Sequence, residues 1–323
     1  MRKISHFIVS SWAATAVAAL LCMGIWIYSI VQDGTGGVLS YLNLLLYLIF
    51  GALIGHHNGE RQTYRSRRVT LPATLFFMGC AINPQLASWQ EGTVYLVLIA
   101  LAYHIISGTY RNQVAMGSYF AAFCLIGTIS LQSPQLLFMT PALILCCSFM
   151  QSLHLRAILA SLLGVLTPYW AAFCILFLTE KPHLISSFVD KLTAVTSLPS
   201  TPLHIPIGEG ESLSVPMVAL QLCWTLLLIL PAIAHHVLST TSAVRARANR
   251  YMQISSMATL LVATHLLPSL YTALQPTVAA LTAILGYGFF ATEKKGRNTR
   301  PIILLIIWLL LLGLYVWNNF LTY

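Results

Sequence analysis

The sequence predicts an all-α membrane protein, a polytopic bundle of about eleven transmembrane helices. Three observations support this fold class: 58% of the 323 residues are hydrophobic, only 8% are charged, and the charges gather between long apolar runs. Soluble domains carry about a quarter charged residues, so this chain cannot cover a water-exposed surface. We therefore expect one integral membrane domain over residues 1–323 instead of two soluble domains.

The apolar runs are long enough to cross a bilayer, which takes about 17–25 residues in a helix. The candidate spans are residues 8–30, 38–55, 70–88, 92–107, 115–131, 134–150, 156–178, 213–236, 251–271, 275–291 and 301–321. The third and fourth spans are the least regular, because Pro84 interrupts one and the other is short. If residues 70–107 form a re-entrant pair, nine spans remain and the later helices keep their orientation.

The first apolar run is a retained helix in this interpretation, because it exceeds the roughly 7–15 apolar residues of a cleaved signal. The basic residues then predict the orientation. With the N-terminus in the cytosol, all 17 lysines and arginines except Lys181 and Lys191 lie on the inner side. Of the 8 acidic residues, only Glu60 and Glu293 lie there. Basic loops resist translocation, so the chain is predicted to be N-in and C-out.

The stretch "HHNGERQTYRSRR", residues 56–68, joins the second and third spans on the inner side. Its first interpretation is a topological loop, and its second is contact with anionic headgroups or phosphates. The side chains that would make such contact are Arg61, Arg65, Arg67 and Arg68. A nucleic-acid site would interleave several aromatic residues with the basic ones. Only Tyr64 is present, so we expect no nucleic-acid partner.

The longest outer loop covers residues 179–212. Within it, Leu184, Phe188 and Leu192 repeat every four residues and form one apolar helical face. This pattern predicts an amphipathic helix over residues 183–193 that lies on the outer membrane surface. The rest is rich in proline, and the loop as a whole is either a connector or a lid over a cavity.

Asp33 follows the first span on the outer side, within "IVQDGTGGVLSY". The flanking glycines allow a tight turn, which alone would explain the stretch. A carboxylate at this place could also take a proton from an acceptor hydroxyl, as a catalytic base does. Both interpretations stay open.

Charged residues are nearly absent from the helix interiors. His265 is the clearest buried polar candidate, with Asn43 and Gln221 as neutral companions, and hydrogen bonding between helices explains such residues. The 7 cysteines lie in apolar runs without a CxxC pair, as small buried side chains do. The adjacent histidines at 56–57 and 235–236 point about 100° apart on a helix, so we expect no metal site. The cofactor stays open.

Residues 117–169 resemble an uncharacterised family of polytopic inner-membrane proteins of Bacteroidota. The matching features are Phe120, Ile126-Gly127, Ser130-Leu131, Arg156, and Gly164 leading into Thr167-Pro168-Tyr169. Members often carry a beta-carotene monooxygenase label, which would need several histidines converging on iron, and the spacing here does not support it. The resemblance implies a multi-pass protein of the inner (cytoplasmic) membrane and no defined activity.

A more distant likeness is to the GT-C superfamily of membrane glycosyltransferases, which use polyprenyl-phosphate sugars. It implies a GT-C-like fold, Asp33 as general base and polyprenyl phosphate among the lipid partners. The chain departs from that superfamily in lacking paired acids in the first outer loop.

Three classes of function follow. One is an enzyme or lipid-handling protein of envelope biogenesis that takes a polyprenyl-phosphate-linked sugar or a related lipid, with the 179–212 loop as its lid. Another is a non-catalytic subunit or scaffold of a cell-envelope complex, with other envelope proteins as partners. A transporter ranks third, because coupled transport needs buried charge that the spans lack.

Overall fold

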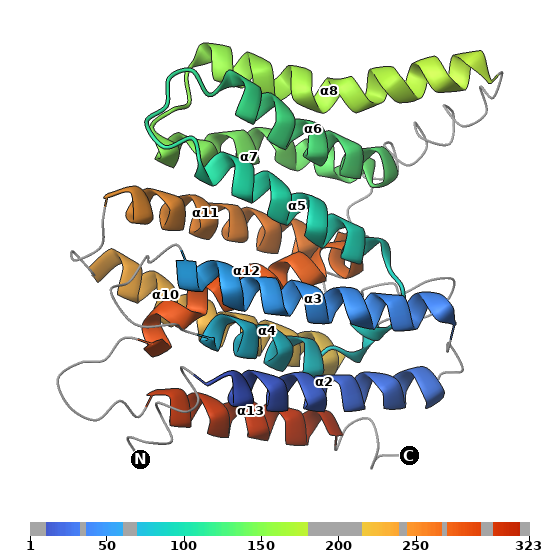
Figure 1. Ribbon diagram of the computed structural model, residues 1–323, viewed down its shortest axis with the longest axis vertical. Helices are drawn as coiled ribbons and strands as arrows, with labels where there is room; N and C mark the ends of the chain where they lie inside the picture. The colour runs from blue at the N-terminus through green and yellow to red at the C-terminus, as the bar shows by residue number, and fades with distance from the viewer. Residues whose placement is uncertain are drawn as a thin grey trace. The chain divides into compact units, whose positions relative to one another are not determined.

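Helices make up all of the regular structure in the described residues. The structure is a computed structural model that describes residues 11–32, 37–60, 70–179, 215–238, 244–266, 270–291 and 300–316 (Figure 1). These ranges hold eleven α-helices and three short 3-10 helices. Three helical segments are long and apolar enough to cross a membrane, namely Trp12–Val31, Val38–Gly55 and Leu155–Leu178. The all-α prediction is confirmed for the described residues, and these segments indicate a multi-pass membrane protein.

The helices group into two compact units. Unit 1 comprises Met1–Thr93, Leu213–Ala243 and Val278–Tyr323, and unit 2 comprises Val94–Ser212 and Val244–Thr277. Unit 1 holds α2 (Trp12–Gln32), α3 (Val38–Glu60), α4 (Leu71–Ala81), η1 (Pro84–Ala87), α10 (Val215–Leu238), α13 (Arg300–Val316) and most of α12 (Tyr271–Ala291). Unit 2 holds most of α5 (Glu91–Ser107), then α6 (Met116–Gln132), η2 (Pro134–Met139), α7 (Thr140–Cys146), η3 (Cys147–Met150), α8 (Leu155–Leu178) and α11 (Val244–Leu266). The single domain expected over residues 1–323 stays a prediction.

Each of the eleven predicted ranges contains an α-helix, but two of them are interrupted. The range 70–88 holds the 11-residue α4 and then η1, which begins at Pro84. The range 134–150 begins at Pro134 with a 3-10 turn, continues as a 7-residue α-helix and ends in a second 3-10 turn. Proline lacks the backbone N–H and favours the first turn of a helix, so Pro84 and Pro134 each start a new segment.

Helix α4 is buried along almost its whole length in unit 1. The helix ends at Ala81, and the backbone N–H of Asn83 donates back to the carbonyl of Cys80 over 3.0 Å. The carbonyls of a last helical turn accept further hydrogen bonds from groups outside the helix. Two tryptophans add further donors at this end: the indole N–H of Trp26 donates to the carbonyl of Cys80, and that of Trp308 donates to the carbonyl of Met78, each over 3.0 Å. A helix end inside a membrane protein needs such partners, since lipid offers none.

Asn43 on α3 supports the 3-10 turn that follows α4. Its side-chain amide donates to the carbonyls of Leu86 over 2.7 Å, Ser88 over 3.0 Å and Ala87 over 3.3 Å. Its oxygen accepts a hydrogen bond of 2.6 Å from the Thr93 hydroxyl. Asn43 is completely buried. The expectation that this residue bonds between helical segments is confirmed, and its partners are mainly backbone groups.

In unit 2, α6 and α8 lie side by side (Figure 1) and approach closely at two glycines. A β-carbon on Gly127 would lie 2.5 Å from the carbonyl oxygen of Val165, and one on Gly164 would collide with the carbonyl oxygen of Phe120. No side chain fits at either position without moving the two backbones apart. Glycine is therefore required at both positions of this helix pair.

The same helix pair is joined by a hydrogen bond of 2.8 Å from the Tyr169 hydroxyl to the Ser130 hydroxyl. Gly127, Ser130, Gly164 and Tyr169 all belong to the residues on which the family resemblance rests. In this structure these four residues pack two helices together. None of the four lines the apolar cavity of unit 2.

Candidate functional site

The residues of the predicted catalytic and phosphate-contact sites lie outside the described residues. They are Asp33, Arg61, Arg65, Arg67 and Arg68, together with the amphipathic segment 183–193. The side chains of His56, His57, His236 and His265 also lie outside them. The candidate site described below is therefore built from other residues, all within unit 2.

Unit 2 contains an apolar cavity of about 40 Å³. It is lined from α5 by Ile99, Ala102, Tyr103 and Ile106, from α6 by Phe123, Ile126 and Ile129, from α11 by Met252, Ser256 and Leu260, and from the broken helix by Leu136, Leu143 and Cys147. A water molecule needs roughly 10–15 Å³ of such space, so about three water-sized groups would fit. An apolar cavity of this size suits a short piece of hydrocarbon chain.

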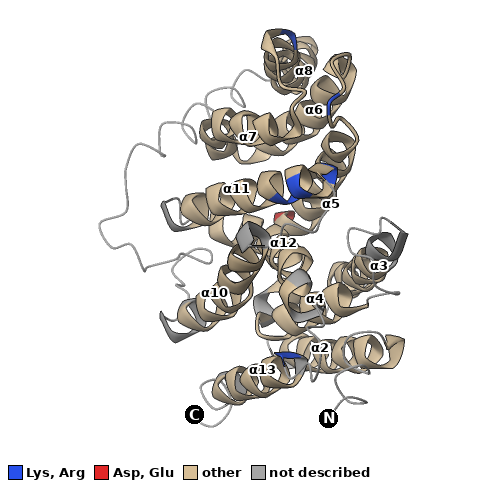
Figure 2. Cartoon of the chain, turned by 90° about the vertical axis from the view of Figure 1, so that its left-hand side faces the viewer, with Lys and Arg blue, Asp and Glu red and all other residues tan. Residues whose placement is uncertain are grey.

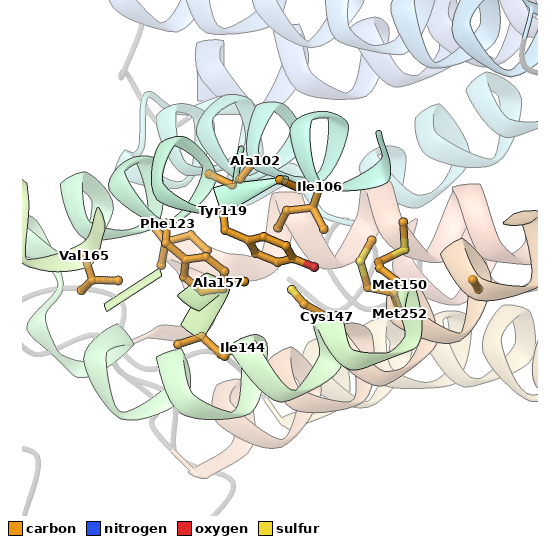
Figure 3. Close-up of a cluster of buried hydrophobic side chains, with 14 residues drawn as sticks. Ala102, Ile106, Tyr119, Phe123, Ile144, Cys147, Met150, Ala157, Val165 and Met252 are labelled. Carbon is orange, nitrogen blue, oxygen red and sulfur yellow. The ribbon is translucent and has the colours of Figure 1, made fainter. Parts of the chain in front are cut away.

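The wall of the cavity is well packed on the α6 side. Tyr119 and Phe123 are both fully buried, and Figure 3 shows the Tyr119 ring within the cluster, between Ile106 and Cys147. Met252 brings α11 into the same cluster. Packed side chains of this kind hold rotamers in place, so the cavity is part of the fold.

Two hydroxyl groups interrupt the apolar lining. Tyr103 and Ser256 both line the cavity, from α5 and α11. The Tyr103 hydroxyl is buried close to Ser256, yet it makes no hydrogen bond of standard geometry with any described residue. A buried hydroxyl left unsatisfied costs about 1–3 kcal/mol. A polar atom of a bound molecule could remove that cost.

A chain of hydrogen bonds connects two turns of unit 2. The Tyr119 and Ser152 hydroxyls are 2.8 Å apart, and Ser152 donates to the Thr109 hydroxyl over 3.2 Å. Thr109 donates in turn to the carbonyl of Ile106 over 2.8 Å. This chain ties the turn after α5 to the turn before α8.

Two residues in left-handed backbone conformation strengthen the same connection. Arg111 has φ 56° and Gln151 has φ 55°, which is uncommon for residues other than glycine. The backbone N–H of Arg111 donates to the carbonyl of Met150 over 3.0 Å, and the side-chain Nε of Arg111 donates to Gln151 Oε1 over 2.9 Å. The hydrogen bonds between the two turns hold both residues in this conformation.

The first two turns of α11 carry Arg245, Arg247 and Arg250 (Figure 2). The predicted span begins at residue 251, which leaves these arginines in a loop. The structure begins the helix at Val244 instead. Arginine and alanine are both strong helix formers, so "VRARANR" was the signal that could have placed these side chains on a helix.

Among the described residues, no three histidine, cysteine or acidic side chains come together in a way that could hold a metal ion. The described residues of unit 2 offer apolar side chains, hydroxyls, thiols, imidazoles and guanidinium groups. This set can bind an amphiphile by its chain and its charge. Comparison of the chain with known protein families, curated proteins and solved structures gives no match.

Proposed function

We propose that this chain is a multi-pass protein of a bacterial inner membrane that binds a polyprenyl-phosphate-linked sugar or a related lipid in envelope biogenesis. The observation that carries the proposal is the apolar cavity of unit 2, with its two hydroxyls. The likeness of residues 117–169 to the Bacteroidota family supports the inner-membrane location. The distant likeness to GT-C glycosyltransferases supports a lipid-linked phosphate as ligand.

The orientation proposed for the chain is N-in and C-out, and the length of α4 supports the nine-span alternative. Its 11 residues extend only about 16 Å, roughly half of the hydrocarbon core. Side chains of α2 and α13 add hydrogen bonds to its last carbonyls, which favours a helix that stops within the membrane. The pair formed by α4 and α5 is therefore proposed to be re-entrant.

Catalysis, where it occurs, would use Asp33 as the general base on the outer side. We expect Asp33→Asn to abolish activity in the enzyme class, because an amide cannot accept the proton. Complementation of a deletion strain measures this effect. Full complementation by the variant would remove Asp33 from catalysis and favour the non-catalytic subunit.

The lipid-binding proposal is tested by filling the cavity. Ala102 is 2% exposed and lines the cavity, so Ala102→Leu places a larger side chain in the space of a bound chain. We expect mass spectrometry to find at least about fivefold less polyprenyl phosphate retained by the mildly purified variant than by the unaltered protein. This corresponds to a loss of about 1 kcal/mol from burying less of the lipid chain. Ala121→Leu, on the exposed side of α6, is the matched control and should retain the lipid.

If the unaltered protein retains only bulk phospholipid and co-purifies with another envelope protein, the scaffold alternative replaces this proposal. If the Ala121→Leu and Ala102→Leu variants lose the lipid equally, the hydrocarbon chain of the lipid does not bind in this cavity.

A further inference from the structure

We infer that the cavity of unit 2 binds a lipid chain that carries an uncharged carbonyl oxygen, and that Tyr103 and Ser256 select for this oxygen. The inference rests on the proposed function, because it takes the cavity as the place where the lipid chain binds. It goes further in naming the class of lipid. Among the related lipids that the proposed function includes, it favours one with an acyl ester or a ketone over a polyprenyl chain, whose hydrocarbon holds no oxygen.

The lining of the cavity has more hydrogen-bond donors than acceptors for them. Tyr103 and Ser256 each bring one O–H donor, from α5 and α11. The Tyr103 hydroxyl is buried and makes no hydrogen bond of standard geometry with any described residue. Even if the two hydroxyls bonded to each other, one would donate and the other would keep a donor without an acceptor. One donor is therefore left over in either case.

The other lining side chains do not supply the missing acceptor. The third polar one is Cys147, whose thiol donates to the carbonyl of Leu143 over 3.3 Å and whose sulfur is only a weak acceptor. The remaining lining residues are apolar, and none is charged. A phosphate or carboxylate in this place would lack compensation for the cost of burying its charge. The missing acceptor is therefore an uncharged atom of the ligand.

A carbonyl oxygen satisfies the leftover donor, whereas an alcohol or a water molecule does not balance the count. A carbonyl has two lone pairs and no donor, and its oxygen projects sideways from a chain toward the wall. An alcohol accepts the leftover hydrogen but brings a donor of its own, and water brings two. A buried water also needs two to four polar partners, and the lining offers it only the two hydroxyls.

The two hydroxyls lie partway along the lining, with apolar side chains on either side. Arg245 Nη2 donates to the carbonyl of Ser107 over 3.3 Å, which brings the start of α11 to the end of α5 (Figure 1). Tyr103 lies before Ser107 and close to Ser256, which lies after Arg245, so the two helices run antiparallel. The apolar neighbours along the lining are Ile106 and Met252 on one side and Ile99 and Leu260 on the other. The ligand oxygen therefore has hydrocarbon on both sides, as an ester or ketone within a chain does.

The test measures the binding of three probes to the full-length protein in an alkyl maltoside, a detergent without carbonyl groups. The probes are methyl laurate, lauryl alcohol and dodecane, and native mass spectrometry gives their relative affinities. The cavity variant combines Tyr103→Phe with Ser256→Ala, which removes both hydroxyls and keeps the aromatic ring. Infrared spectroscopy of methyl laurate, isotope-labelled at its carbonyl carbon, detects the hydrogen bond directly, because accepting one lowers the carbonyl stretching frequency.

Tyr119→Phe combined with Ser152→Ala is the matched control. The Tyr119 and Ser152 hydroxyls are 2.8 Å apart in the same unit, and neither residue lines the cavity. The chemical change is the same, but it removes hydroxyls that already have partners. The control should therefore unfold at a lower temperature than the unaltered protein, whereas the empty cavity variant should unfold at the same or a higher temperature, because it has lost a donor without an acceptor.

We expect the cavity variant to bind methyl laurate about fivefold more weakly than the unaltered protein, which corresponds to the loss of one hydrogen bond. Its affinity for dodecane should stay unchanged, and the shifted carbonyl band should disappear. The control should bind the ester normally and keep the band. An unchanged ester affinity and band in the cavity variant, or lauryl alcohol that binds the unaltered protein as tightly as the ester, would overturn the inference.

Failure of the proposed function gives a different pattern. Ala102→Leu fills the cavity and should weaken the binding of all three probes. If it weakens none of them, the lipid chain does not bind in the cavity, and the proposed function fails together with the inference. If it weakens all three while the cavity variant keeps its ester affinity and the shifted band, the proposed function stands and only the selection for a carbonyl is wrong.

Discussion

Gly164→Ala is expected to destabilise unit 2 by about 2 kcal/mol. The new β-carbon would collide with the carbonyl oxygen of Phe120 on α6, and a backbone atom cannot turn aside as a flexible side chain can. Overpacking of this kind costs up to about 3 kcal/mol, and a clash with a backbone atom belongs at the upper end of that range, whereas alanine regains about 1 kcal/mol of helix propensity. The clash therefore exceeds the gain. Thermal unfolding of the purified protein, followed by tryptophan fluorescence, measures the difference.

Gly117→Ala is the matched control, because Gly117 lies on the same α6 and a β-carbon there would meet nothing within 4 Å. It should leave stability unaltered or raise it by up to about 1 kcal/mol. Gly127→Ala should resemble Gly164→Ala, since its β-carbon meets the Val165 carbonyl. If Gly164→Ala is as stable as Gly117→Ala, the close contact between α6 and α8 is wrong.

Hydropathy alone located every α-helix of the described residues, because each apolar run had to be helical to satisfy its backbone in lipid. It could not locate the helix partners. An apolar residue that faces lipid cannot be told in the sequence from one that faces another helix. In α8, for example, Leu163 is exposed and Val165, two positions later, is buried. The glycines at 127 and 164 stood out only through a family resemblance. Their packing role required coordinates.

The candidate site was harder to predict than the fold. The cavity is lined by residues from 99 to 260, and no local pattern indicates that these side chains meet. The arginines of α11 were visible, but their clustering within a basic segment suggested a loop. The sequence indicated Asn43 as a buried polar residue but not its partners. Its hydrogen bonds to the carbonyls of Leu86, Ala87 and Ser88 depend on a 3-10 turn, and the only sequence sign of that turn was Pro84.

Asn43→Leu is expected to destabilise unit 1 by about 3 kcal/mol. The substitution removes the amide that donates to the carbonyls of Leu86, Ala87 and Ser88, and it removes the acceptor of the Thr93 hydroxyl. Each buried group left without a partner costs about 1–3 kcal/mol, whereas a hydrogen bond inside a membrane protein is worth about 0.6 kcal/mol on average. The site is fully buried, so water cannot replace the amide, and the higher range applies.

Thr93→Val distinguishes the hydrogen bond that Asn43 accepts from those that its amide donates. This variant removes only the hydroxyl that donates to Asn43 Oδ1, and Thr93 is nearly as buried as its partner, so a loss of about 1 kcal/mol is expected. In the double variant the Thr93 hydroxyl is no longer left unsatisfied, so its loss should be smaller than the sum of the two single losses. Chemical denaturation in detergent gives all three values. Additive losses would show that the Asn43–Thr93 bond contributes nothing, and the support of the 3-10 turn would then depend on the three carbonyl bonds alone.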